Sequence, residues 1–116
     1  MAGIIFFKTK QLDQLKTFYI ERIGMKLWLE QADCIIMKHE NLLVGFCQRD
    51  QTDTCGMITF YFETQEEVDT MYEKFKECSL QPPQKNDKYK IYHCFINDPD
   101  GRSVEFQQFL HPVEPV

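Results

Sequence analysis

The chain has 116 residues, of which 43% are hydrophobic and 27% are charged, and its formal net charge is -5 at pH 7. This length suits one small domain with a single core, and the aromatic content of 14% requires rings to be buried in a core, an interface or a ligand cavity. The acidic charge and the absence of a dense Lys/Arg cluster argue against nucleic-acid binding. No apolar run approaches the roughly 20 residues that span a bilayer, so we expect no membrane role.

The sequence has five cysteines, an odd number, and no two of them form a C-x-x-C pair. No signal sequence precedes them. They are Cys34, Cys47, Cys55, Cys78 and Cys94. We therefore expect reduced thiols in a cytoplasmic protein. None of the five stands beside an evident base, so no nucleophilic role is expected.

The first half of the chain predicts a strand, a helix and three further strands. Ile4–Thr9 is short and rich in β-branched and aromatic residues, as strands are. Apolar residues then recur at helical spacing from Leu12 to Ile23, and Gly24 is placed to end that helix. Three strand candidates follow, separated by the polar turns QAD and HEN: 26–30, 34–38 and 42–47. The polar segment 49–56 links this half to the next.

The second half repeats the order of elements. Met57–Phe62 is a strand candidate, and Thr64 and Glu67 form a capping box at the start of a helix. Two further strands, 90–97 and 103–109, are joined by the turn sequence DPDG. The order of elements therefore occurs twice, at a spacing of about half the chain.

Three stretches together resemble the vicinal oxygen chelate superfamily of glyoxalases, bleomycin-resistance proteins and dioxygenases: FKTKQLDQLKTFYIERIGMKL, FETQEEVDTMYEKF and FINDPDGRSVEFQQF. The resemblance implies an α+β fold in which two βαβββ units form a cupped, mostly antiparallel sheet. One domain would then fill residues 1–116, with a first unit at about 1–48 and a second at about 56–112. The resemblance also implies subunit pairing, so we expect a homodimer, for which exposed sheet edges supply a physical reason.

Metal-dependent members of this superfamily hold a divalent ion through side chains in the cup. The resemblance places the three usual ligand positions on Ile4, Met57 and Glu105. An alkyl group and a thioether do not suit a hard or borderline cation, and one carboxylate is too few ligands. We therefore predict that the cup binds no metal and that the protein uses no cofactor.

Alternation along strands predicts which other side chains face the cup. Gln107 shares the face of Glu105, and the geometry of the superfamily adds His93 and Phe95. The predicted ligand-binding residues are Phe6, Lys8, Trp28, Met57, Tyr61, Phe95 and Gln107. Their rings could form an aromatic wall for a flat or hydrophobic molecule, although aromatic residues at strand spacing also occur in plain cores.

His93 and Glu105 are the candidate catalytic residues. A histidine oriented by a carboxylate can move a proton on and off a carbon next to a carbonyl. The alternative for His93 is a structural, partly buried role. The alternative for Glu105 is a hydrogen bond to Lys8 or Tyr61, or contact with a cationic group of a ligand.

Two functions follow, and binding ranks first. The protein would bind a small, partly aromatic or cationic molecule in a metal-free cup, in a way similar to the bleomycin-resistance branch. The alternative is a glyoxalase-like or dioxygenase-like lyase or isomerase that uses His93 and Glu105, with or without an atypically placed metal. A cup filled by side chains, leaving an interaction module, ranks third.

Overall fold

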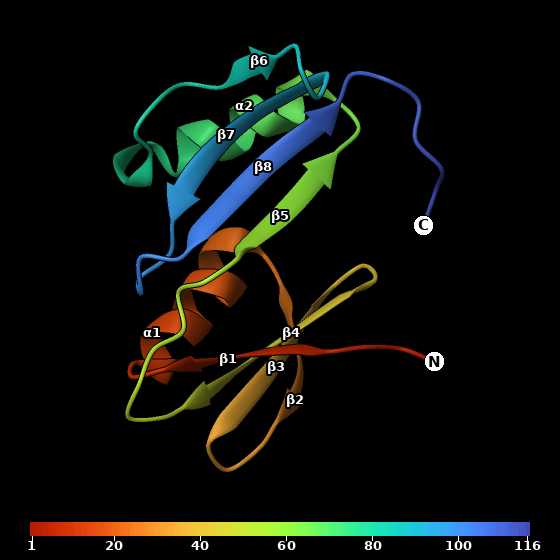
Figure 1. The fold of residues 1–116 in the computed structure, drawn as a ribbon. Coiled ribbons are helices and arrows are strands. Elements are labelled where there is room, and N and C mark those ends of the chain that lie inside the picture. Colours follow the sequence, from red (N-terminus) through yellow and green to blue (C-terminus); the bar gives the residue numbers. More distant parts are fainter. The chain divides into compact units, whose positions relative to one another are not determined.

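The computed structural model describes residues 1–116 and divides them into two compact units, Met1–Thr54 and Cys55–Val116. Each unit is a βαβββ arrangement with its own four-stranded sheet (Figure 1). The predicted α+β fold class is confirmed. The strands lie in two sheets, one in each unit, and two of the three strand pairs in each sheet are antiparallel.

The first unit contains the strands β1 (Ile5–Thr9), β2 (Lys26–Glu30), β3 (Cys34–His39) and β4 (Leu42–Gln48). They lie in the order β1-β4-β3-β2, and β1 runs parallel to β4. Because parallel neighbours need a crossover connection, the helix between β1 and β2 makes this order possible.

The helix of the first unit begins as α1 (Leu12–Thr17) and continues as the π-helical segment η1 (Phe18–Ile23). Gly24 ends it with a φ of 98°, as expected for a residue without a Cβ. Tyr19 is fully buried and stacks on Phe46 of β4, with ring centroids 5.1 Å apart. This aromatic pair holds the helix against one face of the sheet.

Cys34 and Cys47 form a disulfide, so the prediction of reduced thiols differs from the structure. The pairing of β3 with β4 places these two residues directly opposite each other, with Cα atoms 4.1 Å apart. Their separation of 13 residues matches no short cysteine motif. Only the register of the hairpin brings them together, which is why sequence spacing missed the pair. Cys55, Cys78 and Cys94 are not disulfide-bonded.

The second unit contains β5 (Met57–Phe62), α2 (Gln65–Lys74), the 3-10 turn η2 (Lys76–Cys78), β6 (Gln84–Asn86), β7 (Ile91–Asn97) and β8 (Ser103–Phe109). The sheet order is β5-β8-β7-β6, with β5 parallel to β8. The sequence did not predict β6, because three polar residues carry no alternating pattern.

Thr64 caps the helix α2 as predicted, and the Glu67 carboxylate bonds the Thr64 hydroxyl rather than the backbone N–H that a capping box uses. Thr64 Oγ1 accepts a hydrogen bond from the backbone N–H of Glu67 at 3.2 Å and donates to the Glu67 carboxylate at 2.9 Å. Phe75, just beyond the helix, is fully buried and packs on Phe106 of β8, with ring centroids 5.7 Å apart. The helix therefore covers the face of the sheet that carries Phe106 (Figure 1).

The DPDG turn between β7 and β8 is organised around a buried ion pair. Asp98 accepts hydrogen bonds from the backbone N–H groups of Asp100 and Arg102 at 2.9 and 3.0 Å. The guanidinium of Arg102 donates to the other Asp98 oxygen at 2.6 Å, and both side chains are fully buried. Gly101 has a φ of 86°, which favours glycine. The turn thus determines where β8 begins.

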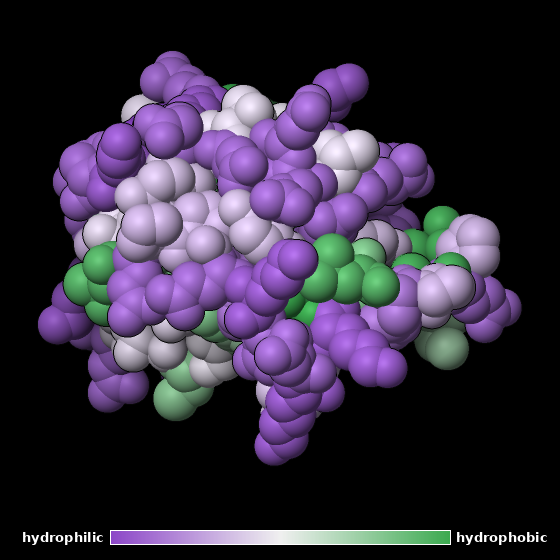
Figure 2. Space-filling model, turned by 90° about the horizontal axis from the view of Figure 1, so that it is seen from above, coloured by the Kyte–Doolittle hydropathy of each residue, from purple (hydrophilic) through white to green (hydrophobic).

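Hydrophilic side chains cover most of the face shown in Figure 2, and strongly hydrophobic atoms form small groups on it. On the edge strand β2, however, Leu27, Trp28 and Leu29 are 42%, 50% and 43% exposed. No helix here has the length or the apolar character that crossing a bilayer requires.

Candidate functional site

An open cavity of about 770 Å³, here called the main cavity, lies in the second unit. Five of the residues predicted to face the cup line it: Met57, His93, Phe95, Glu105 and Gln107. Glu105 and Gln107 alternate along β8 with Phe106, which packs under α2. The main cavity therefore lies on the face of the sheet that α2 leaves uncovered.

Glu105 is the buried polar centre of this face, at 4% exposure. On β5, Thr59 lies directly opposite and its hydroxyl donates to Glu105 Oε1 at 2.9 Å. On β7, His93 Nδ1 lies 2.6 Å from Glu105 Oε2. One carboxylate thus joins three strands, with a hydrogen-bond partner on each oxygen.

The contact with Glu105 orients the His93 ring. With the carboxylate bound at Nδ1, Nε2 is the ring nitrogen that can accept a proton from a ligand or donate one to it. The side chain is 15% exposed and lines the main cavity. Its ring also meets Phe95 edge-on, with centroids 4.9 Å apart, which restricts its rotation.

Tyr61, predicted to face the cup and considered as a partner of Glu105, lies on the same strand as Thr59. It pairs with Gln107 across β5 and β8, and its ring packs against Phe109 at 5.4 Å between centroids. Thr59, two residues nearer the start of β5, is the side chain that contacts the carboxylate. A side chain directly opposite in the ladder reaches its partner more easily than one two residues further on.

The other three predicted binding residues belong to the first unit, whereas every residue lining the main cavity comes from the second. The ring of Phe6 lies very close to Gly45: a Cβ added at residue 45 would stand 2.4 Å from two atoms of the Phe6 ring. The backbone N–H of Lys8 donates to Asp53 Oδ2 at 2.9 Å. Trp28 occupies a β-bulge in β2.

The main cavity also has lining residues that the sequence analysis missed: Asn86, Tyr89, Ile91, Phe109 and His111. Ile91 and Phe109 follow by alternation from His93 and Glu105 and could have been found that way. Asn86 joins them only because β6 pairs with β7. His111, which lies just beyond β8, carried no sequence signal for this position.

The side chains around Glu105 do not fit a divalent metal. His93 and Glu105 are the two adjacent donors of the usual types, whereas Met57 and Thr59 on β5 offer a thioether and a hydroxyl. Metal sites in proteins require three or more such ligands, and no group of three His, Cys, Asp or Glu side chains is arranged to hold an ion. We therefore derive no metal-assisted step.

The opposite face of β7 carries two titratable side chains. Burial raises the pKa of Cys94 from 9.0 to about 11, and the charges of Asp69 and Glu105 add to the effect. Burial also raises the pKa of Tyr92 to about 12, with help from its hydrogen bond of 2.5 Å to Asp69. Both groups stay neutral near pH 7.

We expect the protein to lose stability in alkaline solution as Cys94 ionises. The pKa of Cys94 in the folded protein lies above its ordinary value. The neutral thiol therefore contributes its full stabilisation below pH 9, and this stabilisation is lost as the pH rises through 11. The loss should approach about 2 kcal/mol. Urea unfolding at pH 8 and pH 10.5 tests this. Cys94→Ala should flatten the pH dependence, whereas Cys55→Ala, at an exposed position, should leave it unchanged. Equal pH dependence in all three proteins would contradict the assignment.

No protein-family model matches the sequence, and no curated protein matches it. Solved structures match over nearly the whole chain. Lactoylglutathione lyase from Agrobacterium tumefaciens is 19% identical with a TM-score of 0.76, covering 93% of this chain and 92% of that one. A glyoxalase/bleomycin resistance protein/dioxygenase from Nocardioides is 15% identical with a TM-score of 0.77, covering 100% and 87%. A glyoxalase-related enzyme from Fulvimarina pelagi is 17% identical with a TM-score of 0.79, covering 100% and 91%.

At these identities the likeness shows the fold and leaves activity open. The element order, the two βαβββ units and the coverage of nearly the whole chain agree with the resemblance found in the sequence. The chain therefore has the fold of the glyoxalase/bleomycin resistance/dioxygenase structures.

Proposed function

We propose that the protein binds a small, partly aromatic molecule in the main cavity. The observation that carries this proposal is an open cavity of about 770 Å³ whose wall combines Met57, Phe95 and Phe109 with the polar groups of His93 and Gln107. Ligand pockets typically measure about 300–1,000 Å³ and have apolar walls with a few polar groups that orient the ligand.

The arrangement around Glu105 favours an uncharged polar group on the ligand over a cationic one. Both carboxylate oxygens already have protein partners, Thr59 and His93. A ligand cation would compete with these contacts in a buried position. The Gln107 amide can instead donate to a carbonyl oxygen, and His93 Nε2 can accept from a hydroxyl or, as an imidazolium, donate to a carbonyl. The aromatic alternative of the sequence analysis thus has the stronger support.

Acetophenone, a ring bearing one carbonyl, is a suitable probe. In a protein-observed NMR titration we expect shifts concentrated on β7 and β8. Phe95→Ala should weaken binding about fivefold, because stacking and edge contacts between rings contribute about 1 kcal/mol. Val116→Ala, at the exposed C-terminus, is the control and should bind as the wild type does. Shifts outside residues 57–111, or an unchanged affinity for Phe95→Ala, would sink the proposal.

Proton transfer is a second candidate, favoured by the 2.6 Å contact between His93 Nδ1 and Glu105 Oε2. His93 Nε2 would take a proton from the carbon next to the ligand carbonyl, and the carboxylate would stabilise the resulting imidazolium. Exchange of the methyl protons of acetophenone in D₂O measures this step. Wild type should accelerate the exchange and His93→Gln should abolish the acceleration. If the wild-type protein does not accelerate the exchange, the proton-transfer function is wrong and only the binding function remains.

We also propose that residues 1–116 act as one domain that forms a homodimer in the cytoplasm. The edge strand β2, with its half-exposed Leu27, Trp28 and Leu29, is a surface suited to pairing. Native mass spectrometry should then show twice the 13.9 kDa of one chain.

A further inference from the structure

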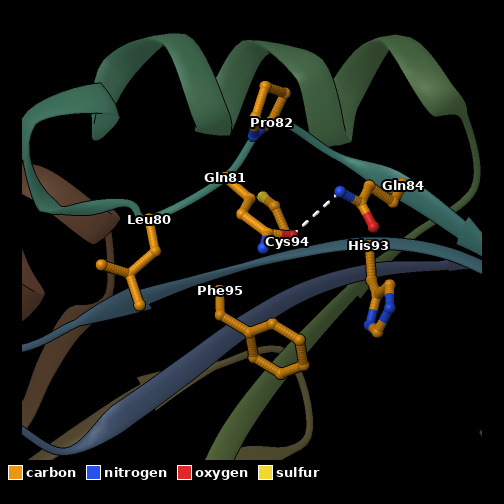
Figure 3. Close-up of a pocket in the computed structure, with 7 residues that line it drawn as sticks. All are labelled: Leu80, Gln81, Pro82, Gln84, His93, Cys94 and Phe95. Atoms are coloured by element: carbon orange, nitrogen blue, oxygen red, sulfur yellow. Dashed lines mark hydrogen bonds between the residues drawn. The ribbon is translucent and has the colours of Figure 1, made fainter.

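We infer that a second hollow beside the main cavity is a subsite for a short, uncharged aliphatic arm of the ligand. This side pocket of about 240 Å³ lies between β7 and residues 79–84, here called the strap (Figure 3). The inference rests on the proposed function, because the arm belongs to a ligand whose ring and polar group occupy the main cavity.

The strap is attached at both ends and stands away from β7 in between. At one end, Ser79 pairs with Ile96 and its hydroxyl donates to the backbone carbonyl of Phe95 at 3.0 Å. At the other end, Gln84 pairs with His93 as β6 begins.

Prolines explain the gap between these two attachments. Pro82 and Pro83 have no backbone N–H, so they cannot continue a ladder of hydrogen bonds with β7. The stretch of β7 that contains Cys94 consequently has a hollow beside it instead of a paired strand.

The walls of the side pocket are apolar. Leu80, Pro82 and Phe95 contribute carbon atoms, and the neutral thiol of Cys94 behaves as a small hydrophobic group. The side-chain amides of Gln81 and Gln84 are bonded to each other at 2.9 Å, the dashed line in Figure 3. No lining residue carries a formal charge except His93 when it is protonated. Such walls suit methylene groups and disfavour ions.

His93 and Phe95 connect the two spaces, since both line the main cavity and the side pocket. Figure 3 shows these two side chains on the same side of β7, pointing away from the strap. A polar group held at His93 therefore lies at the junction between the spaces. A chain attached to that group can pass Phe95 and enter the side pocket.

The size of the side pocket limits the length of the arm. Since a liquid water molecule occupies about 30 Å³, a volume of about 240 Å³ has room for at most about eight groups of that size, and an arm of four carbon atoms fits within it. Leu80 is 93% exposed. An arm that covers it removes apolar surface from water, which favours binding.

A series of phenyl ketones tests the subsite: acetophenone, propiophenone, butyrophenone and valerophenone keep the ring and carbonyl while the alkyl chain grows. Wild-type affinity should rise about fourfold for each added methylene. Leu80→Asp should abolish this dependence on chain length and leave acetophenone binding unchanged. Val116→Asp, at another highly exposed position, should retain the full dependence.

The outcomes separate this inference from the proposed function. If acetophenone binds on β7 and β8 but affinity is independent of chain length, or rises equally in wild type and Leu80→Asp, the subsite is wrong and the proposed function stands. If no ketone of the series binds, the proposed function fails and the subsite fails with it.

Discussion

Replacing Arg102 with Met is expected to lower the free energy of unfolding by about 3–5 kcal/mol. The guanidinium is fully buried, donates to Asp98 at 2.6 Å and lies 3.5 Å from an Asp100 oxygen. Methionine has a similar length, so packing is largely kept. The two carboxylates, however, would remain buried without their cation, which costs far more than the loss of an exposed ion pair.

Arg49→Met is the matched control for Arg102→Met. Arg49 also bonds an aspartate, Asp33, at 2.9 Å, but both side chains are largely exposed. Its replacement should cost less than about 1 kcal/mol. Urea unfolding of both variants measures the difference, and equal losses would contradict the role given to the buried turn. Because β8 begins at Ser103, the Arg102 variant should also disturb the NMR signals of Glu105.

Phe106→Ala should cost about 3–5 kcal/mol, the second large effect, because a buried ring leaves a cavity that the core cannot refill. Phe106 is fully buried and meets the rings of Phe60, Phe62 and Phe75 at centroid distances of 6.3, 6.2 and 5.7 Å. Thermal or urea unfolding measures the loss.

Phe95→Ala is the counterpart on the other face of the same sheet. Phe95 pairs with Glu105 across β7 and β8 and is 45% exposed. Its removal should cost less than about 1 kcal/mol of stability, as most changes outside the core do. It should nevertheless weaken acetophenone binding. A large stability loss for Phe95→Ala together with a small loss for Phe106→Ala would mean that the two faces of the sheet are assigned the wrong way round.

The sequence by itself determined most elements, because local signals decide them. The strand Met57–Phe62, the cap at Thr64 and Gly24 at a left-handed helix end each depend on a few neighbouring residues, and each is present as predicted. Alternation placed Gln107 on the face of Glu105, since the side-chain period of a strand is a local property, whereas the resemblance to the superfamily was needed to add His93 from another strand. The short strand β6 escaped detection because it is too short to show a period.

The tertiary structure alone decided which side chains meet. The Cys34–Cys47 disulfide depends on the register of β3 with β4. The bond from Thr59 to Glu105 joins residues 46 positions apart through the parallel pairing of β5 and β8. The side pocket depends on where the strap leaves β7. Register is set by the packing of whole strands, and a shift of one residue reverses every side chain, so contacts of this kind cannot be read from local patterns.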